Sequence, residues 1–365
     1  KTSVITRKIA HLVKNCGIPA HRITAMTFTN KAAREMKERV TKLLSREEAK
    51  GLSVSTFHTF GLNLLRLELK NTPLKANFSI LDADDCKRIL MDLMHRDNLS
   101  GAESKELIAK AMKMISDWKN DLIPPEQAHT TCETAEDVQM AHLYQLYERN
   151  LRAYNAVDFD DLIVMPTLLL QQNAEVRDRW QNRTRYLLVD EYQDTSHIQY
   201  EILRLIVSKR NSLVTFIGDK EQAIYTGLGA VVKNREELFD YFNLEELEEM
   251  RLTGCFRSSQ SIIDFYSKYK DDAYYINSLS ELKTFPSVIL KENSVDITQL
   301  SVYVSGIIKT HLEQGISPSE IAVLCPSWFD VIKLSNEIIS LNSDLDIDGI
   351  MVSPIPKNNE NLWLN

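Results

Sequence analysis

The sequence has no long apolar run, no internal repeat and no low-complexity segment. No uninterrupted apolar stretch approaches the roughly 18 residues that a membrane-spanning helix requires. The first residues, Lys1-Thr2-Ser3, do not lead into the apolar core of a secretory signal. These absences argue against a transmembrane protein, and we expect neither a secretory leader nor a membrane partner.

Cysteine is scarce, and its five copies are scattered singly along the chain. Without close pairs they predict no metal-binding knuckle, and they are typical of reduced thiols, so we expect a cytoplasmic location. The 43 basic residues are outnumbered by 51 acidic ones, and the net charge of −8 argues against a protein that coats polyanions with its whole surface. A local groove could still bind nucleic acid.

What is present is a globular composition, with 44% hydrophobic and 26% charged residues in 365, which predicts two or three domains. Four short β-forming runs each end abruptly in polar residues, at 23–28, 52–57, 186–189 and 213–218. Helical spacing between several of them, as at 32–44 and 198–207, predicts an α/β fold with a parallel sheet covered on both faces. Because ligands bind such sheets at the carboxyl ends of the strands, we expect the four polar segments to meet at one edge.

Residues from about 84 to 153 follow a different pattern, with apolar residues at helical spacing and no strand between them. The clearest series is Ile108, Ala111, Met112, Ile115 and Trp118. The pattern predicts an all-helical insertion between strands of the sheet. Candidate strands at 288–291 and 321–325 then indicate a second α/β unit, which we expect to be incomplete.

Two short motifs are candidates for phosphate chemistry. Asp190-Glu191 follows an apolar run, where one carboxylate can hold Mg²⁺ and the next can activate a water; such a pair can equally cap a helix. Lys1-Thr2 matches the end of the phosphate-binding loop G-x-x-x-x-G-K-[ST], in which the lysine contacts phosphates and the hydroxyl holds Mg²⁺. Taken alone, Lys1 is also explained as a terminal lysine without a role.

Five longer motifs, one of which begins with Asp190-Glu191, occur in a fixed order. They are Thr27-Phe28-Thr29-Asn30-Lys31-Ala32-Ala33-Arg34-Glu35-Met36, Ser55-Thr56-Phe57-His58-Thr59, Asp158-Phe159-Asp160-Asp161-Leu162, Asp190-Glu191-Tyr192-Gln193-Asp194 and Gly218-Asp219-Lys220-Glu221-Gln222-Ala223-Ile224-Tyr225. Together they resemble the Rep/UvrD/PcrA-type helicases of superfamily 1. The resemblance covers roughly residues 1–265, including Trp118-Lys119-Asn120-Asp121-Leu122 in the helical stretch.

The resemblance implies a RecA-like ATPase domain of the P-loop NTPase class at 1–60 and 165–265, a helical insertion at 61–164 and an incomplete second RecA-like domain at 266–365. It implies an ATP- and Mg²⁺-dependent helicase that moves 3′→5′ along single-stranded DNA, acts at junctions with duplex DNA and serves replication or repair. The chain would be the N-terminal portion of such a protein, truncated at both ends and a weak ATPase by itself.

The resemblance also assigns roles at the nucleotide. Lys1 and Thr2 match the phosphate lysine and the Mg²⁺ hydroxyl, while Asp190 matches the Mg²⁺ carboxylate and Glu191 the group that activates the attacking water. The glutamine that senses the γ-phosphate is matched by Gln222, the arginine that reaches this phosphate by Arg257, and the adenine-stacking ring by Phe256. An arginine suits its role because its planar fork spreads charge over phosphoryl oxygens.

Four residues match positions where the family holds single-stranded DNA: Phe28, Asn30, His58 and Tyr225. Aromatic faces stack bases without regard to sequence, at about 1–3 kcal/mol per base, while polar groups follow the phosphates. Phe28 is also explained as a core residue at a strand end, and His58 as a capping or core histidine.

The chain departs from the family after Tyr225, where Thr226-Gly227-Leu228-Gly229-Ala230 replaces the usual Ser-Trp-Arg-Gly-Ala. Lys220-Glu221 replaces an acidic pair, and Ser3 replaces an arginine that packs on adenine. The lost tryptophan and arginine should weaken the grip on DNA. They favour an alternative, a helicase-like ATP- and DNA-binding subunit of a repair or defence complex that does not unwind DNA by itself.

Overall fold

A computed structural model of the chain describes residues 1–97, 105–207, 212–226, 229–270, 274–284, 287 and 296–342. The chain divides into two compact units, one formed by Lys1–Glu249 and the other within Met250–Leu362. The part of the chain that the structure describes contains no helix long and apolar enough to cross a bilayer.

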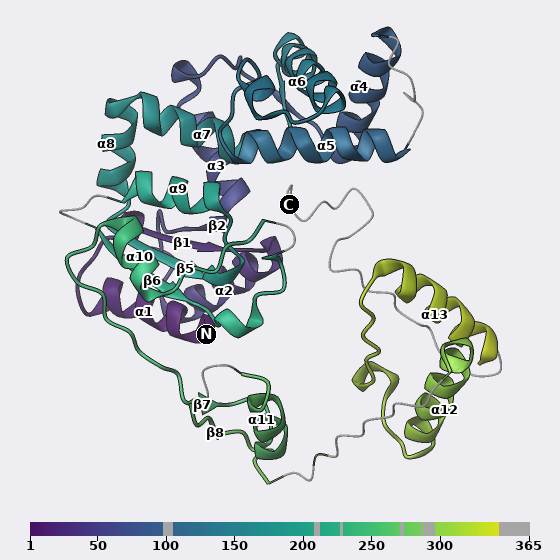
Figure 1. The fold of residues 1–365 in the computed structure, drawn as a ribbon. Coiled ribbons are helices and arrows are strands. Elements are labelled where there is room, and N and C mark those ends of the chain that lie inside the picture. Colours follow the sequence, from purple (N-terminus) through teal and green to yellow (C-terminus); the bar gives the residue numbers. More distant parts are fainter. Residues whose placement is uncertain are drawn as a thin grey trace. The chain divides into compact units, whose positions relative to one another are not determined.

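The first unit is built on a four-stranded parallel sheet in the order β2-β1-β5-β6 (Figure 1). Its strands are β1 (Ile23–Thr27), β2 (Ser53–Thr56), β5 (Tyr186–Asp190) and β6 (Leu213–Ile217). Each strand lies within the run expected from the sequence or extends it by one residue. Because all neighbouring pairs are parallel, the polar segments that follow the strands leave the sheet at the same edge. The predicted parallel sheet is confirmed.

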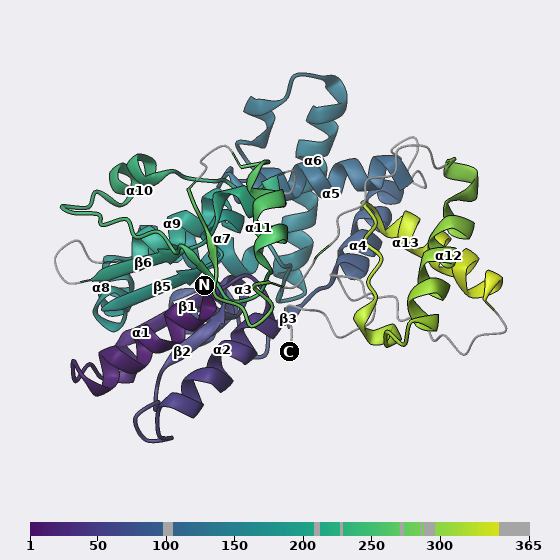
Figure 2. The ribbon, with the colours of Figure 1, turned by 90° about the horizontal axis from the view of Figure 1, so that it is seen from below.

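Successive side chains along a strand point to opposite faces of the sheet, so the strands contribute to two separate hydrophobic cores, one on each face. In β5, Leu188 packs beneath α1 (Thr2–Lys14) and α2 (Asn30–Leu43), whereas Leu187 and Val189 pack on the opposite face. The second face is covered by α3 (Phe57–Leu67), α7 (Asp161–Gln172), α8 (Ala174–Arg183) and α9 (His197–Ile206), with α10 (Arg235–Phe242) at its margin. Figures 1 and 2 show α1 and α2 together on one side of the sheet and α9 on the other.

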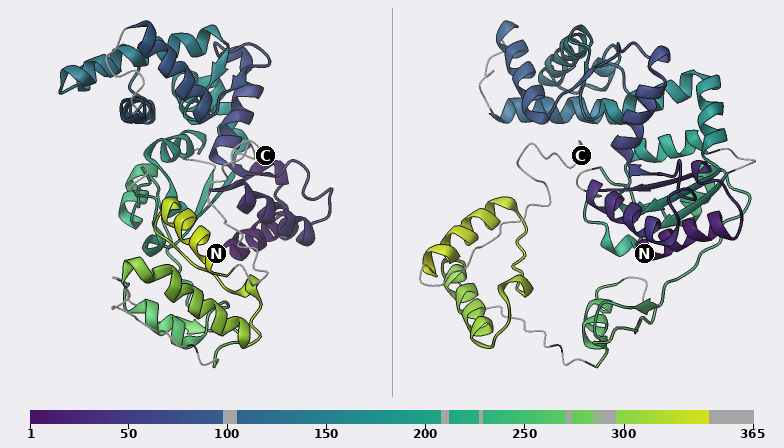
Figure 3. Two further views of the ribbon diagram at one scale, coloured as in Figure 1. Left: turned by 90° about the vertical axis from the view of Figure 1, so that its right-hand side faces the viewer. Right: turned by 180° about the vertical axis from the view of Figure 1, so that it is seen from behind.

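The helical insertion forms its own layer on the α3 and α7 side of the sheet (Figures 1 and 3). It contains α4 (Ala83–Arg96), α5 (Lys105–Asn120) and α6 (Ala135–Ala153). Of the apolar series expected to face a core, Ile108, Ala111, Ile115 and Trp118 are buried against α4 and α6, and Met112 is partly buried at the edge of the same core. Two short strands, β3 (Ser79–Ile80) and β4 (Ala156–Val157), pair in parallel beside these helices.

The second unit contains α11 (Gln260–Ser267), α12 (Leu300–Glu313) and α13 (Trp328–Leu341), with a parallel pair formed by β7 (Gly254–Cys255) and β8 (Asn277–Ser278). The predicted strand at 321–325 is wrong: these residues form no regular element, and Leu324 is 94% exposed. An isolated apolar run is not stable as a strand without hydrogen-bonded neighbours. None of the described strands pairs with residues 321–325. The other candidate, at 288–291, lies outside the described residues.

Candidate nucleotide and DNA site

Three elements bring polar side chains to the carboxyl edge of the sheet. Helix α1 begins at Thr2, directly after Lys1; β5 ends at Asp190; and β6 is followed by a short 3₁₀ turn at Lys220–Gln222. Ile5 and Ile9 of α1 are fully buried against the sheet, which fixes the start of this helix near the end of β5. The sheet order, with β6 next to β5, then places the third segment beside the other two.

The side chains of these elements form a network of two hydrogen-bonded groups, joined because Lys1 is adjacent to Thr2 and Asp190 to Glu191 in the chain. The Nζ atom of Lys1 forms an ion pair with Glu191 and donates a hydrogen bond to Oε1 of Gln222 at 3.0 Å. The hydroxyl of Thr2 donates to Oδ2 of Asp190 at 2.9 Å. Five of the residues singled out for the nucleotide site are therefore in contact although up to 221 positions separate them in the chain.

The carboxylate of Asp190 has an oxygen atom that could bind a cation. It is 3% exposed, and its Oδ1 atom is buried without a hydrogen-bond partner among the described residues. Burial raises the pKa of Asp190, and nearby Glu191 raises it further, while the Thr2 hydroxyl and Lys1 oppose the shift. An unpaired carboxylate oxygen beside a threonine hydroxyl is the donor set that Mg²⁺ prefers, so these residues fit that metal.

Gln193 links the segment after β5 to the segment after β6. It was not singled out as a site residue from the sequence. Its Nε2 donates to Oε2 of Glu191 at 3.1 Å, and its Oε1 accepts from the backbone N–H of Asp219 at 3.1 Å. Gly218 leaves room for this link, because a Cβ there would lie 2.4 Å from Oε1 of Gln193. Asp219 in turn accepts from Nε2 of Gln222 at 2.9 Å. The only sequence signal for Gln193 was its place in the motif that begins at Asp190.

Glu191 also acts on a second acidic side chain of this motif, that of Asp194. Glu191 lies in the left-handed backbone region, with φ of +51°, and its carboxylate forms the ion pair with Lys1. Burial, reinforced by the charge of Glu191, raises the pKa of Asp194 to about 6.

The other two residues expected at the nucleotide, Phe256 and Arg257, belong to the second unit. They follow β7, and both side chains are exposed; Phe256 is 77% exposed. Their roles stay predictions.

The residues expected to contact DNA follow β1, β2 and β6 at the same edge. The ring of Phe28 stacks on that of Tyr225, with centroids 5.0 Å apart and planes inclined by 30°. Asn30 begins α2, which Thr29 caps by accepting from the N–H of Ala32 at 3.1 Å. Asn30 is buried, and its Nδ2 has no hydrogen-bond partner in the described part of the chain.

His58 lies in the first turn of α3, which Thr56 caps through the N–H of Thr59 at 3.2 Å. Its ring meets Phe159 edge to face, with centroids 6.1 Å apart. Burial lowers the pKa of His58 to about 4, so the imidazole is neutral at pH 7. A neutral ring held against an aromatic side chain is suited to packing on a base or donating one hydrogen bond, and it is not suited to acting as a fixed positive charge.

Comparison with known proteins identifies the class. The family model described as the UvrD/REP helicase N-terminal domain matches residues 1–243, about two thirds of the chain. The chain therefore belongs to this family, which confirms the resemblance drawn from its motifs and the RecA-like character of the sheet.

Individual relatives agree with this assignment. The chain is 49% identical over 263 residues to the ATP-dependent DNA helicase Rep of Escherichia coli (strain K12), covering 72% of this chain and 38% of that protein. It is 35% identical over 333 residues to the Rep helicase of Buchnera aphidicola subsp. Acyrthosiphon pisum (strain APS), covering 89% and 50%. The ATP-dependent DNA helicase PcrA of Leuconostoc citreum is 37% identical over 265 residues, covering 72% and 35%. The chain thus spans half or less of the length of these relatives.

Proposed function

We propose that this chain supplies the first motor domain of an ATP-dependent DNA helicase that moves along single-stranded DNA. The observation that carries the proposal is the network at the carboxyl edge of the sheet, in which Lys1, Thr2, Asp190, Glu191 and Gln222 are connected in a chain of the UvrD/Rep family. These side chains supply a cation for phosphates, a ligand pair for a metal and a carboxylate beside them.

Each of these residues has a proposed role at ATP and Mg²⁺. Lys1 neutralises the β- and γ-phosphates, and the N-terminus of α1 favours the same negative charge. Thr2 and Asp190 hold Mg²⁺, which when bound would neutralise charge that develops on the phosphate oxygens. Glu191 accepts a proton from the attacking water, and Gln222 contacts the γ-phosphate.

Phe256 and Arg257, which follow β7, have roles in this proposal that come from the family resemblance. Phe256 stacks on adenine and Arg257 stabilises the γ-phosphate. The domain assignment belongs to the same proposal: a RecA-like ATPase domain at 1–60 and 165–265, the helical insertion at 61–164 and part of a second RecA-like domain at 266–365.

For DNA, Phe28 and Tyr225 form an aromatic platform, with Asn30 and His58 at the neighbouring strand ends. The bases of single-stranded DNA would stack on the two rings without sequence preference. Movement in the 3′→5′ direction, action at junctions with duplex DNA and a cytoplasmic role in replication or repair are part of this proposal.

The proposal is tested with Glu191→Gln in the full-length protein. Removing the carboxylate while keeping its shape should lower the rate of DNA-stimulated ATP hydrolysis at least about 100-fold, as expected for loss of a general base. Affinity for a fluorescent ATP analogue should remain, because Lys1 and Asp190 are intact. Glu35→Gln, on the exposed face of α2, is the matched control and should hydrolyse ATP normally. Hydrolysis that survives Glu191→Gln would contradict the role of Glu191.

A second candidate is a helicase-like subunit that binds ATP and DNA but does not unwind DNA alone. It is favoured by the segment after Tyr225, which lacks the tryptophan and arginine typical of the family. Measuring ATP hydrolysis by the isolated full-length protein separates the two. Strong stimulation by single-stranded DNA without other proteins supports the motor, whereas hydrolysis that requires a partner supports the subunit.

A further inference from the structure

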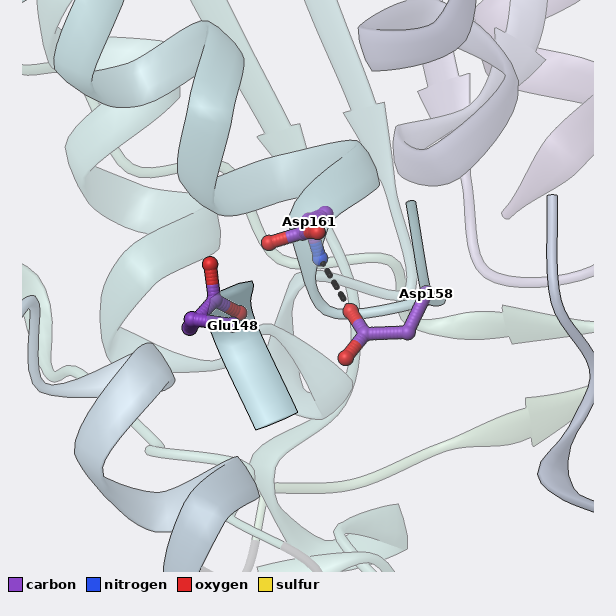
Figure 4. A group of neighbouring side chains, drawn as sticks. All are labelled: Glu148, Asp158 and Asp161. Atoms are coloured by element: carbon purple, nitrogen blue, oxygen red, sulfur yellow. Dashed lines mark hydrogen bonds between the residues drawn. The ribbon is translucent and has the colours of Figure 1, made fainter. Parts of the chain in front are cut away.

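A buried lysine lies where the helical insertion meets the ATPase fold. Lys119, near the end of α5, is 2% exposed, and its Nζ atom contacts carboxylates of Glu148 at 2.6 Å, Asp158 at 2.7 Å and Asp161 at 2.9 Å. Figure 4 shows the three carboxylates gathered around a common point. We call these four residues the Lys119 cluster. None of them belongs to the proposed nucleotide or DNA site.

The geometry of the three carboxylates resembles a cation site, since their oxygens lie within 4.8 Å of one another. The ammonium of Lys119 already occupies that position. Burial alone would lower the pKa of Lys119, but the surrounding carboxylates reverse the effect and raise it, so the lysine stays charged. The charged Lys119 side chain therefore takes the place of a metal ion in this cluster, and its ion pairs join α5 and α6 to the start of α7.

Stability alone is a weak explanation for such a cluster. Buried ion pairs lose much of their Coulomb energy to desolvation, and apolar side chains of similar volume often stabilise a fold as well or better. In some proteins a buried ion pair instead fixes the orientation of its partners. The question is which structure Lys119 orients.

The structure it orients is the turn from Asp158 to Asp161, which begins α7. Lys119 forms ion pairs with Asp158 and Asp161, the first and last residues of this turn. Within the turn, Oδ1 of Asp158 accepts a hydrogen bond from the backbone N–H of Asp161 at 2.9 Å. Phe159 lies inside the turn, and its ring meets that of His58. The first turn of α7 also packs closely against α3. A Cβ at Gly61 of α3 would lie only 1.8 Å from the carbonyl oxygen of Leu162 in α7.

We propose that Lys119 is a positioning residue for DNA binding: by fixing the turn from Asp158 to Asp161 from the side of the helical insertion, it sets the place of Phe159 and hence of His58. This inference rests on the proposed DNA role of His58. It makes the helical insertion a support for the DNA contact at α3.

The test is Lys119→Met in the full chain, with Lys113→Met as the matched control. Lys113 lies on the same helix, but its ion pair with Asp117 is exposed. Binding of a short fluorescein-labelled oligothymidine is measured by anisotropy. Lys119→Met should raise its Kd about tenfold, the effect of losing one base contact. Affinity for a fluorescent ATP analogue should change by less than about twofold, and Lys113→Met should leave both affinities unchanged.

A double-mutant cycle with His58→Ala distinguishes positioning from general damage. If Lys119 acts through His58, Lys119→Met should weaken DNA binding in the wild type and add nothing in the His58→Ala background. Effects of the two substitutions that multiply would overturn the inference and leave the proposed function intact. A His58→Ala variant that binds DNA normally would overturn the DNA role of His58 and the inference with it.

Should Lys119→Met fail to fold, Phe159→Leu enters the same cycle. Phe159 is only partly buried, and leucine keeps an apolar side chain while removing the ring that faces His58. The expected result is again weaker oligothymidine binding with no further loss in the His58→Ala background. Unchanged binding by Phe159→Leu would overturn the inference.

Discussion

Glu191, the proposed activator of water, is held in a conformation that its backbone does not favour. A residue other than glycine with φ of +51° costs of order 1–3 kcal/mol, which the surroundings must offset. Two contacts of its carboxylate do so, the ion pair with Lys1 and the hydrogen bond from Gln193. Because Gln193 also holds the backbone of Asp219, the orientation of Glu191 is tied to the loop that carries Gln222. A shift of that loop would therefore reach Glu191 directly.

His58 gives a prediction for the pH dependence of stability. Its pKa is lowered from 6.5 to about 4 by burial, so between these values the unfolded chain binds a proton that the folded chain does not. The free energy of unfolding should therefore fall as the pH drops from 7 toward 5. His58→Gln cannot bind this proton, and its loss of stability over that range should be smaller by about 2 kcal/mol.

The measurement is the thermal midpoint of both proteins at pH 7 and pH 5. Comparing the two proteins cancels the titration of the carboxylates that they share, including Asp194. Parallel curves for wild type and His58→Gln would show that His58 titrates normally in the folded protein, contrary to its burial against Phe159.

At the scale of elements, α3 and α7 pack so closely at Gly61 that no larger side chain fits between them. A Cβ at Gly61 would overlap the carbonyl oxygen of Leu162 and also approach Cγ of Pro166 at 3.3 Å. Gly61→Ala should therefore separate the two helices and destabilise the first unit by about 3 kcal/mol. A clear fall in thermal midpoint should accompany weaker oligothymidine binding, because His58 lies one turn away on α3.

Gly306→Ala is the control for this substitution. Gly306 also lies inside a helix, α12, but nothing lies within 4 Å of its Cβ position, so alanine should be neutral or stabilise that helix by up to about 1 kcal/mol. Equal midpoints for Gly61→Ala and wild type would show that α3 and α7 can move apart without cost.

The elements differ in how far the sequence could predict them. The strands of the sheet were predictable because each is a short apolar run that ends at a polar motif, and α5 because its apolar residues recur at helical spacing. The run at 321–325 has the same local pattern as a strand but no described neighbour to pair with, and pairing is not visible in a single segment. Gln193 and Lys119 were not assigned because their roles arise from contacts between elements, 26 and up to 42 positions apart.

At the scale of the whole molecule, the nucleotide and DNA residues divide unequally between the two units. All nine of the assigned residues in the first unit lie at one edge of its sheet, whereas Phe256 and Arg257 alone belong to the second. The sequence placed the change from one RecA-like domain to the next near 265. The compact units divide between Glu249 and Met250, so Arg257 groups with the helices that follow it.

This division predicts that a fragment ending at Glu249 folds by itself and keeps a nucleotide site. Its sheet, both of its cores and the network from Lys1 to Gln222 are internal to it. The fragment should unfold cooperatively and bind a fluorescent ATP analogue within about tenfold of the affinity of the longer chain, a difference of about 1.4 kcal/mol. Hydrolysis should be lost, because the fragment lacks the proposed Arg257 contact to the γ-phosphate.

Asp190→Asn in the same fragment identifies the site that is being measured. This change keeps the shape of the side chain but removes the charge next to Thr2, so Mg²⁺ should no longer increase the affinity for the analogue, while affinity without Mg²⁺ should change little. If Asp190→Asn leaves the affinity in the presence of Mg²⁺ unchanged, the nucleotide binds elsewhere. A fragment that does not fold would show that the sheet requires residues after Glu249, contrary to the division of the chain into two units.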